Sequence, residues 1–136
     1  MPVRVVIIDD VYLNARLIEQ ALRGLDGIVT EIFQGPHQAL ERLASGPVDL
    51  IILDYRLPGM SGTDVLNRLR AMPHLSAVPV LGITGVTDPS AMDAMQRAGA
   101  DDLLRKPINP EVLRDRCARL ISRHQLRSSG GSGGGA

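Results

Sequence analysis

The chain has 136 residues, 44% of them apolar and only 2% aromatic, so its core must be aliphatic. About 127 residues precede a last stretch of Ser, Gly and Ala, which suits one compact domain and is too short for two. The net charge of zero argues against a dominant role in binding nucleic acid or a membrane surface. No apolar run exceeds four residues, which excludes a membrane span. A single cysteine, Cys117, excludes an internal disulfide, and together with the lack of an opening signal segment it predicts a cytoplasmic location.

Aliphatic segments alternate with amphipathic ones along the chain. The predicted strands are residues 3–8, 28–33, 48–53, 78–84 and a short segment around 103–104. The predicted helices are residues 11–25, 36–44, a third that begins at a capping box over 61–64, a fourth from an N-cap at 88 to about 98, and a fifth from 109–110 to about 124. Continuous aliphatic runs are typical of strands buried on both faces. The alternation therefore predicts an α/β fold with a five-stranded parallel sheet, doubly wound as (βα)5, and helices on both faces.

The last nine residues, 128–136, contain only Ser, Gly and Ala. This composition is typical of a flexible linker. We therefore predict one folded domain over residues 1–127 and a Gly/Ser tail over 128–136, which is either a linker or a remnant added for expression.

Polar residues stand where the predicted strands end. The first strand is followed by Asp9 and Asp10, the third by Asp54, the fourth ends in Thr84, and the fifth leads to Lys106. Lys106 is the one lysine in a chain that otherwise uses arginine for its basic residues. Carboxyl ends of parallel strands meet at one edge of a sheet, so we expect these groups to converge.

Three converging carboxylates repel one another unless a cation lies between them. Mg²⁺ prefers oxygen ligands and is often held by one or two carboxylates together with phosphate oxygens. Such a site makes Asp54 a plausible nucleophile toward phosphorus, with Lys106 stabilising charge on the transferred group and Thr84 donating to it.

In these motifs the sequence resembles the receiver domain of bacterial two-component response regulators. The resemblance rests on Asp9-Asp10, on Ile51-Ile52-Leu53-Asp54 followed by Leu57-Pro58-Gly59, on Thr84, and on Gly99-Ala100-Asp101-Asp102 leading to Lys106-Pro107. The intervals are typical of the family: 44 to 45 residues from the acidic pair to Asp54, 30 to Thr84 and 22 to Lys106. The resemblance covers residues 3 to about 124 and implies a flavodoxin-like fold.

The resemblance implies a role in a phosphorelay. Asp54 would accept a phosphoryl group from a sensor histidine kinase or a phosphotransfer protein, in a reaction that depends on Mg²⁺. Asp10 and Asp54 would bind the metal directly, Asp9 directly or through water, and the backbone carbonyl of Arg56 would be a further ligand.

The other two positions would respond to the phosphoryl group. Thr84 would hydrogen-bond it, and Lys106 would pair with Asp54 and then with the phosphate. The Lys106–Pro107 peptide bond is expected to be cis, which is inexpensive only before proline.

One position departs from the family pattern. Many receivers carry Tyr or Phe three residues before the lysine, and this chain has Leu103 there. We expect activation to move the segment over residues 86–95 after the fourth strand, with a readout that differs from the aromatic type.

The expected output is a change of surface for an unidentified effector domain or partner protein, and turnover of an external substrate is not expected. Direct binding to nucleic acid or membrane is not expected either. Asp102 and Arg116 match positions that form intersubunit ion pairs in some receivers, so a homodimer through the fourth helix, fifth strand and fifth helix is a further hypothesis.

Three other functions remain as alternatives. An aspartyl-phosphate phosphatase of the haloacid-dehalogenase type needs an acid two residues past its nucleophile, where this chain has Arg56. A flavin or nucleotide module needs a Gly-rich or Ser/Thr-rich loop after the first strand, where this chain has the acidic pair. A phosphorylation-independent interaction module remains open because the aromatic residue is replaced by Leu103.

Overall fold

The computed structural model describes residues 2–85 and 89–134. Five parallel strands form one sheet in the order β2-β1-β3-β4-β5. The strands are β1 (Val3–Ile8), β2 (Ile28–Phe33), β3 (Leu50–Asp54), β4 (Val80–Thr84) and β5 (Asp102–Arg105). The predicted five-stranded parallel sheet is confirmed.

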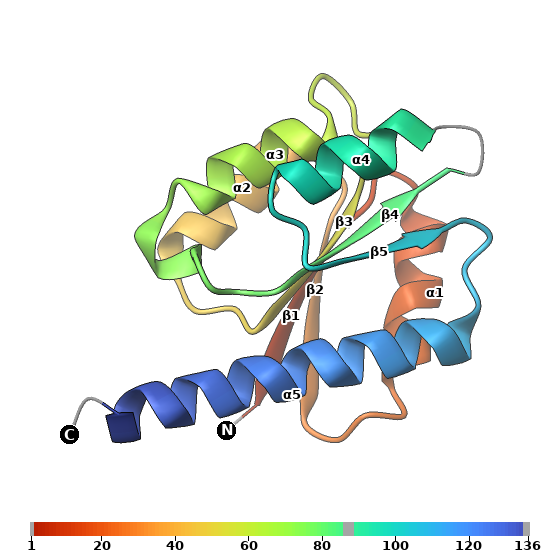
Figure 1. Ribbon diagram of the computed structural model, residues 1–136. Helices are drawn as coiled ribbons and strands as arrows, with labels where there is room; N and C mark the ends of the chain where they lie inside the picture. The colour runs from red at the N-terminus through yellow and green to blue at the C-terminus, as the bar shows by residue number, and fades with distance from the viewer. Residues whose placement is uncertain (1, 86–88, 135–136) are drawn as a thin grey trace.

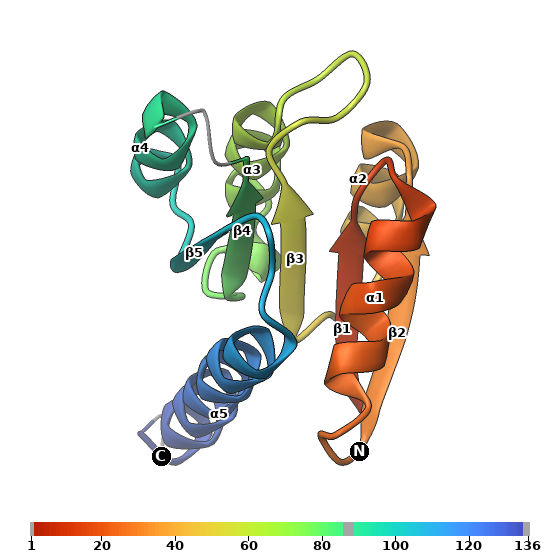
Figure 2. The same ribbon diagram turned by 90° about the vertical axis from the view of Figure 1, so that its right-hand side faces the viewer.

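The described residues also form five α-helices and one short 3₁₀ helix. They are α1 (Tyr12–Leu22), α2 (Pro36–Ser45), α3 (Gly62–Arg70), η1 (Pro73–Leu75), α4 (Pro89–Arg97) and α5 (Pro110–Gly134). Helices α1 and α5 cover one face of the sheet, while α2, α3 and α4 cover the other (Figures 1 and 2). The doubly wound arrangement is confirmed.

Successive residues of β1 serve two separate aliphatic layers. Val5 and Ile7 belong to the layer beneath α1 and α5. Val6 and Ile8 belong to the layer beneath α2, α3 and α4. Because side chains alternate between the faces of a strand, covering both faces requires an unbroken aliphatic run. The four side chains are at most 1% exposed, which accounts for the pattern read from the sequence.

The fourth strand begins later than predicted. Its expected start at residue 78 is wrong because the N–H of Val78 donates to the carbonyl of Leu75 and closes the turn after η1. Pro79 follows and has no N–H to give to the ladder. The ladder therefore begins at Val80, and the prediction also missed η1.

The capping residues of α3 and α5 act as predicted. Ser61 Oγ accepts from the N–H of Asp64, and the Asp64 carboxylate accepts from the N–H of Ser61, both at 3.1 Å. Asn109 Oδ1 accepts from the N–H of Glu111 at the start of α5. The predicted N-cap at residue 88 lies outside the described residues.

Helix α5 is longer than predicted, since it continues past His124 to Gly134. Its predicted end is therefore wrong, although glycine is a poor helix former and adds little stability there. The division into a domain over 1–127 and a linker over 128–136 stays a prediction. None of the described helices is both long enough and apolar enough to cross a membrane.

Candidate phosphoacceptor and metal site

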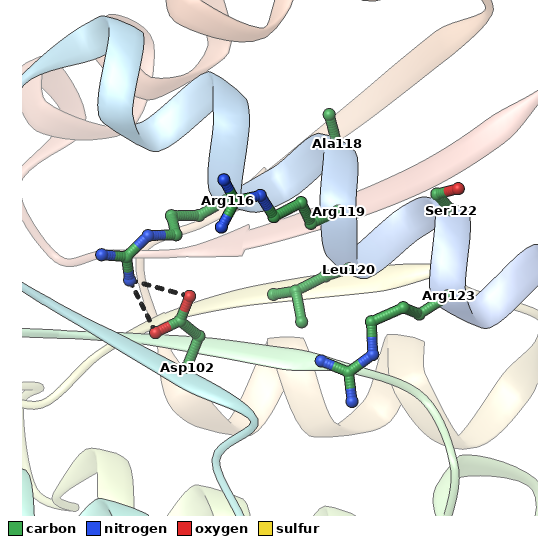
Figure 3. A pocket seen from close by; sticks show the side chains of 7 residues that line it. All are labelled: Asp102, Arg116, Ala118, Arg119, Leu120, Ser122 and Arg123. Atoms are coloured by element: carbon green, nitrogen blue, oxygen red, sulfur yellow. Dashed lines mark hydrogen bonds and ion pairs between the residues drawn. The ribbon is translucent and has the colours of Figure 1, made fainter.

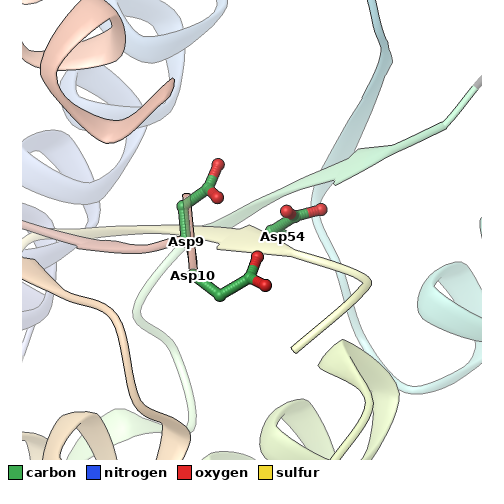
Figure 4. Close-up of side chains that lie close together, drawn as sticks. All are labelled: Asp9, Asp10 and Asp54. Atoms are coloured by element: carbon green, nitrogen blue, oxygen red, sulfur yellow. The ribbon is translucent and has the colours of Figure 1, made fainter. Parts of the chain in front are cut away.

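Two carboxylates lie at the ends of adjacent strands. Asp54 is the last residue of β3, and Asp9 directly follows β1. Because Ile8 and Leu53 are register partners, the sheet places these two carboxyl groups side by side. One carboxylate oxygen from each of Asp9, Asp10 and Asp54 lies within 4.8 Å of the others (Figure 4). The predicted convergence of the three acids is confirmed.

The carboxyl group of Asp9 is held in an unfavourable environment for its charge. Its side chain is buried, and this burial is the main reason that its pKa rises from 3.8 to about 6. The N–H of Val11 donates to Asp9 Oδ1 at 2.9 Å and, together with Lys106, opposes the rise, whereas Asp54 and Asp10 add to it. Asp9 Oδ2 is buried and has no hydrogen-bond partner among the described residues. This oxygen needs a cation or another donor.

Lys106 reaches the carboxylate of Asp54. The distance from Lys106 Nζ to Asp54 Oδ2 is 3.1 Å, and the Asp54 side chain is only 3% exposed. The backbone N–H of Lys106 donates to the carbonyl of Thr84, which ties the end of β5 to the end of β4. The Lys106–Pro107 peptide bond is cis, as expected. The single lysine side chain of the sequence therefore faces the proposed nucleophile.

Thr84 lies at the carboxyl end of β4, beside the end of β3. It is fully buried, and its Oγ1 has no hydrogen-bond partner among the described residues. A buried hydroxyl without a partner costs stability, so its presence needs a reason. A phosphoryl oxygen bound at Asp54 would supply the missing acceptor.

A close backbone contact shapes the loop after β3. The N–H of Gly62 donates to the carbonyl of Tyr55 at 2.6 Å. A Cβ on Gly62 would lie 2.6 Å from the carbonyl oxygen of Asp54 and 2.8 Å from the Cα of Tyr55. Only glycine fits there without displacing the loop. The side chain of Arg56 is exposed, and the metal role of its carbonyl stays a prediction.

Leu103 occupies the position where many receivers carry an aromatic residue. It pairs in register with Gly82 on β4 and packs in the layer that contains Met95 of α4. Part of the segment expected to move, residues 86–88, lies outside the described residues. Sequence reasoning missed that Gly62 and Gly82 make room for neighbours; glycine inside an aliphatic strand was the available signal for Gly82.

The donor set fits a hard divalent cation. One oxygen from each of three carboxylates lies within 4.8 Å of the others, and one buried carboxylate oxygen has no partner in the described part of the chain. Oxygen ligands of this kind suit Mg²⁺. An ammonium and a buried hydroxyl stand on the other side of Asp54, where a phosphoryl group would carry negative charge. The arrangement is chemically suited to placing phosphate on Asp54.

Comparison with known proteins agrees with this geometry. The profile of the response regulator receiver domain matches residues 5–118. The chain belongs to this family. The receiver is 30% identical over 120 residues to the chemotaxis protein CheY of Pseudomonas aeruginosa, covering 88% of this chain and 97% of CheY.

A second relative is much longer. The receiver is 38% identical over 129 residues to the cyclic di-GMP phosphodiesterase response regulator RpfG of Xanthomonas campestris. The match covers 92% of this chain and 33% of RpfG, so the chain spans about a third of that relative's length.

A solved structure shows the expected metal in a relative. The receiver domain of a sensor histidine kinase from Pseudomonas aeruginosa PAO1 holds a magnesium ion in its active-site cleft. It is 25% identical to this chain, with a TM-score of 0.81, and the match covers 90% of this chain and 99% of that one.

Proposed function

We propose that this receiver accepts a phosphoryl group on Asp54 from a histidine kinase or a phosphotransfer protein and thereby changes its surface. The observation that carries the proposal is the pairing of a 3%-exposed Asp54 with Lys106 at 3.1 Å, beside the carboxylates of Asp9 and Asp10. A surface carboxylate has no need of burial beside an ammonium and two other acids. A nucleophile whose phosphorylated product carries extra negative charge does need such neighbours.

The transfer step follows from the groups in place. A lone pair on an Asp54 carboxylate oxygen attacks phosphorus and forms an O–P bond. The P–N bond of the donor's phosphohistidine breaks, and the imidazole leaves with the electron pair. Lys106 stabilises the negative charge on the phosphoryl oxygens, and the Thr84 hydroxyl donates to one of them.

A magnesium ion would be held by Asp10, Asp54 and the carbonyl of Arg56, with Asp9 bound directly or through water. When bound, it neutralises charge on the carboxylates and on the transferred phosphoryl group. The Asp9 oxygen that has no partner in residues 2–85 and 89–134 and the close set of three acids support this assignment.

An exposed apolar surface next to the site suits the phosphoryl donor. Val11, Tyr12, Leu13 and Leu17 at the start of α1 are 47%, 54%, 67% and 56% exposed. A groove of about 640 Å³ separates this helix from the segment after β5, and Lys106 lines one part of it. A partner that covers this surface would bring its phosphohistidine to Asp54, because contiguous exposed apolar side chains mark interaction sites.

The output we propose is signalling in the cytoplasm through an effector domain or partner protein of unknown identity, with no turnover of an external substrate. The phosphodiesterase activity in RpfG's name is that of RpfG, whose length is about three times that of the matched region.

A homodimer through α4, β5 and α5 remains part of the proposal. Arg116 and Asp102 stand on this face, and they pair within the single chain at 2.8 Å. Light scattering with the phosphate mimic beryllofluoride should give a mass that rises with protein concentration. A mass that stays that of a monomer removes the dimer.

A phosphorylation-independent interaction module is the second candidate. The observation that favours it is the sequence of β5, in which Leu103, the register partner of Gly82, stands where an aromatic residue would report phosphorylation. Under this reading a partner would bind equally well with and without phosphate.

The deciding experiment is intact-mass spectrometry after incubation with acetyl phosphate and Mg²⁺. We expect a gain of about 80 Da, the mass of one phosphoryl group, that needs Mg²⁺ and is absent from Asp54→Asn. Asp26→Asn is the matched control, since Asp26 is an exposed acid just before β2, at the opposite end of the parallel strands from Asp54. Labelling that persists in Asp54→Asn, or that is unchanged when Mg²⁺ is removed by a chelator, would contradict the proposal.

A further inference from the structure

Helix α5 carries more arginine side chains than find partners in neighbouring elements. Its arginines are Arg114, Arg116, Arg119, Arg123 and Arg127. Arg114 donates from Nε to the carbonyl of Ala21, and Arg116 pairs with Asp102. The side chains of the other three are exposed and form no ion pair or hydrogen bond with any described residue.

The unpaired arginines share one face of the helix. Arg119, Arg123 and Arg127 follow one another at intervals of four residues, which places them one helical turn apart. Like charges at this spacing repel each other and destabilise a helix slightly. A counter-charge from outside the chain would remove that cost.

Two of these arginines line a hollow of about 600 Å³ beside β5. Figure 3 shows the hollow with Arg119 and Arg123 on its wall and Leu120 between them. Ser122 adds a hydroxyl to the lining. This volume is in the range of small-ligand sites, and the lining combines cations, a hydroxyl and an apolar side chain.

Asp102, the acid in the lining, does not neutralise the positive charge of Arg119 and Arg123. Both carboxylate oxygens of Asp102 accept from Arg116 Nη1, at 2.8 and 2.9 Å (Figure 3). Asp102 and Arg116 therefore cancel each other's charge, and the charges of Arg119 and Arg123 remain. The chain as a whole has a net charge of zero, so the excess of positive charge is confined to this hollow. It therefore does not give the whole protein a general affinity for polyanions.

We infer that this hollow is a binding site for a small phosphorylated ligand of nucleotide size. Guanidinium groups match phosphate oxygens with two parallel hydrogen bonds, and arginine is favoured over lysine where that geometry matters. Arg119 and Arg123 each hold one phosphate of a ligand that carries two. The site is separate from Asp54 and does not depend on the proposed phosphoryl transfer.

The test is isothermal titration with pyrophosphate and with ATP as probes, at low salt and with EDTA to keep divalent metal out of the acidic site. Light scattering first sets a protein concentration at which the chain is monomeric, since a second copy on this face would compete. We expect saturable binding of both probes and none of adenosine, which lacks phosphate. Binding that does not saturate, or that is equal for adenosine, overturns the inference.

Variants locate the site. Arg119→Ala and Arg123→Ala should each weaken ATP binding by about tenfold, the loss of a charge-assisted pair. Arg119→Lys keeps the charge but lacks the fork, so it should bind ATP more weakly than the unaltered protein. Arg68→Ala is the matched control, because Arg68 is an exposed arginine on α3. Equal weakening by Arg68→Ala would show nonspecific attraction and overturn the inference.

Two further readouts keep the outcome clear. A peptide of glutamate residues should bind at least tenfold more weakly than ATP; equal binding would assign the surface to an acidic protein segment and overturn the ligand proposed here. Asp54→Asn should bind ATP as the unaltered protein does, and Arg119→Ala should still be labelled by acetyl phosphate. Circular dichroism confirms that each variant is folded.

Discussion

Leu103 fills the space that Gly82 leaves empty. The two residues are register partners on β5 and β4, and a Cβ on Gly82 would lie 2.6 Å from Leu103 Cδ2. The same Cβ would lie 2.9 Å from Cε of Met95, a fully buried residue of α4. The junction of β4, β5 and α4 is therefore packed by two flexible aliphatic side chains over a glycine.

This packing predicts the effect of adding one methyl group. Gly82→Ala should lower the free energy of unfolding by about 1–3 kcal/mol through overpacking, measured by urea denaturation. Gly85→Ala is the control, since a Cβ there meets nothing within 4 Å. Combining Gly82→Ala with Leu103→Ala should give a smaller loss than the sum of the single losses; strict additivity would contradict the proposed contact.

Removal of one acid tests the metal site. Asp9 is 1% exposed and lies beside two other carboxylates, so Asp9→Asn should raise the melting temperature in EDTA. The same change should shrink the rise that Mg²⁺ causes, because binding to the native state stabilises it. Differential scanning fluorimetry with and without Mg²⁺ measures both effects. An unchanged Mg²⁺ response in Asp9→Asn would count against a role for this carboxylate.

The thiol of Cys117 should be inert in the folded protein. Burial, and to a smaller extent the charge of Asp102, raises the pKa of Cys117 from 9.0 to about 12. The unfolded thiol ionises above about pH 9 while the folded thiol keeps its proton, so this group makes stability fall as pH rises above 9. Urea denaturation at pH 8 and pH 10 should show a smaller loss for Cys117→Ala than for the unaltered protein.

A reagent for thiols offers an independent check of Cys117. Dithionitrobenzoate at pH 8 should label the thiol only in urea, since the thiolate is the reactive form and the side chain is buried. Rapid labelling of the native protein would contradict the burial.

Arg70 holds two loops together at the opposite end of the sheet from Asp54. Its Nη1 donates to the carbonyls of Leu75 and Val78, and its Nη2 donates to the carbonyl of Gly99 and to Asp101. Arg70→Ala removes four hydrogen bonds, although the Leu75 carbonyl still accepts from Val78 and Asp101 still accepts from Val80, and it should cost about 2–4 kcal/mol in urea denaturation. Arg68→Ala, on the exposed side of the same helix, should stay within about 0.5 kcal/mol. Equal losses for the two variants would mean that the contacts of Arg70 add nothing.

Truncation tests the predicted domain boundary. A chain that ends at Arg127 should unfold within about 0.5 kcal/mol of the full chain, because glycine adds little to helix stability. Thermal and urea denaturation of the two chains compare them directly. A larger loss would show that residues 128–136 belong to the folded domain.

Local pattern was enough to place most of the site in this protein. The unbroken aliphatic runs of β1 and β3 identify buried parallel strands, and Asp9 and Asp54 follow because strand ends are visible in the sequence. Lys106, the only lysine of the sequence, and Pro107 after it could also be identified from the sequence. Hydrophobic period and turn chemistry act over a few residues, so the sequence alone carries them.

Contacts between distant elements needed the folded chain. The convergence of Asp9 and Asp54 was expected, but only packing reveals that Asp9 Oδ2 lacks a partner among the described residues. The space shared by Gly82 and Leu103 and the pairing of Asp102 with Arg116 inside one chain were also hidden. Each of these features depends on how side chains from separate segments pack together in the same space. The local pattern of apolar residues along the sequence does not determine such packing.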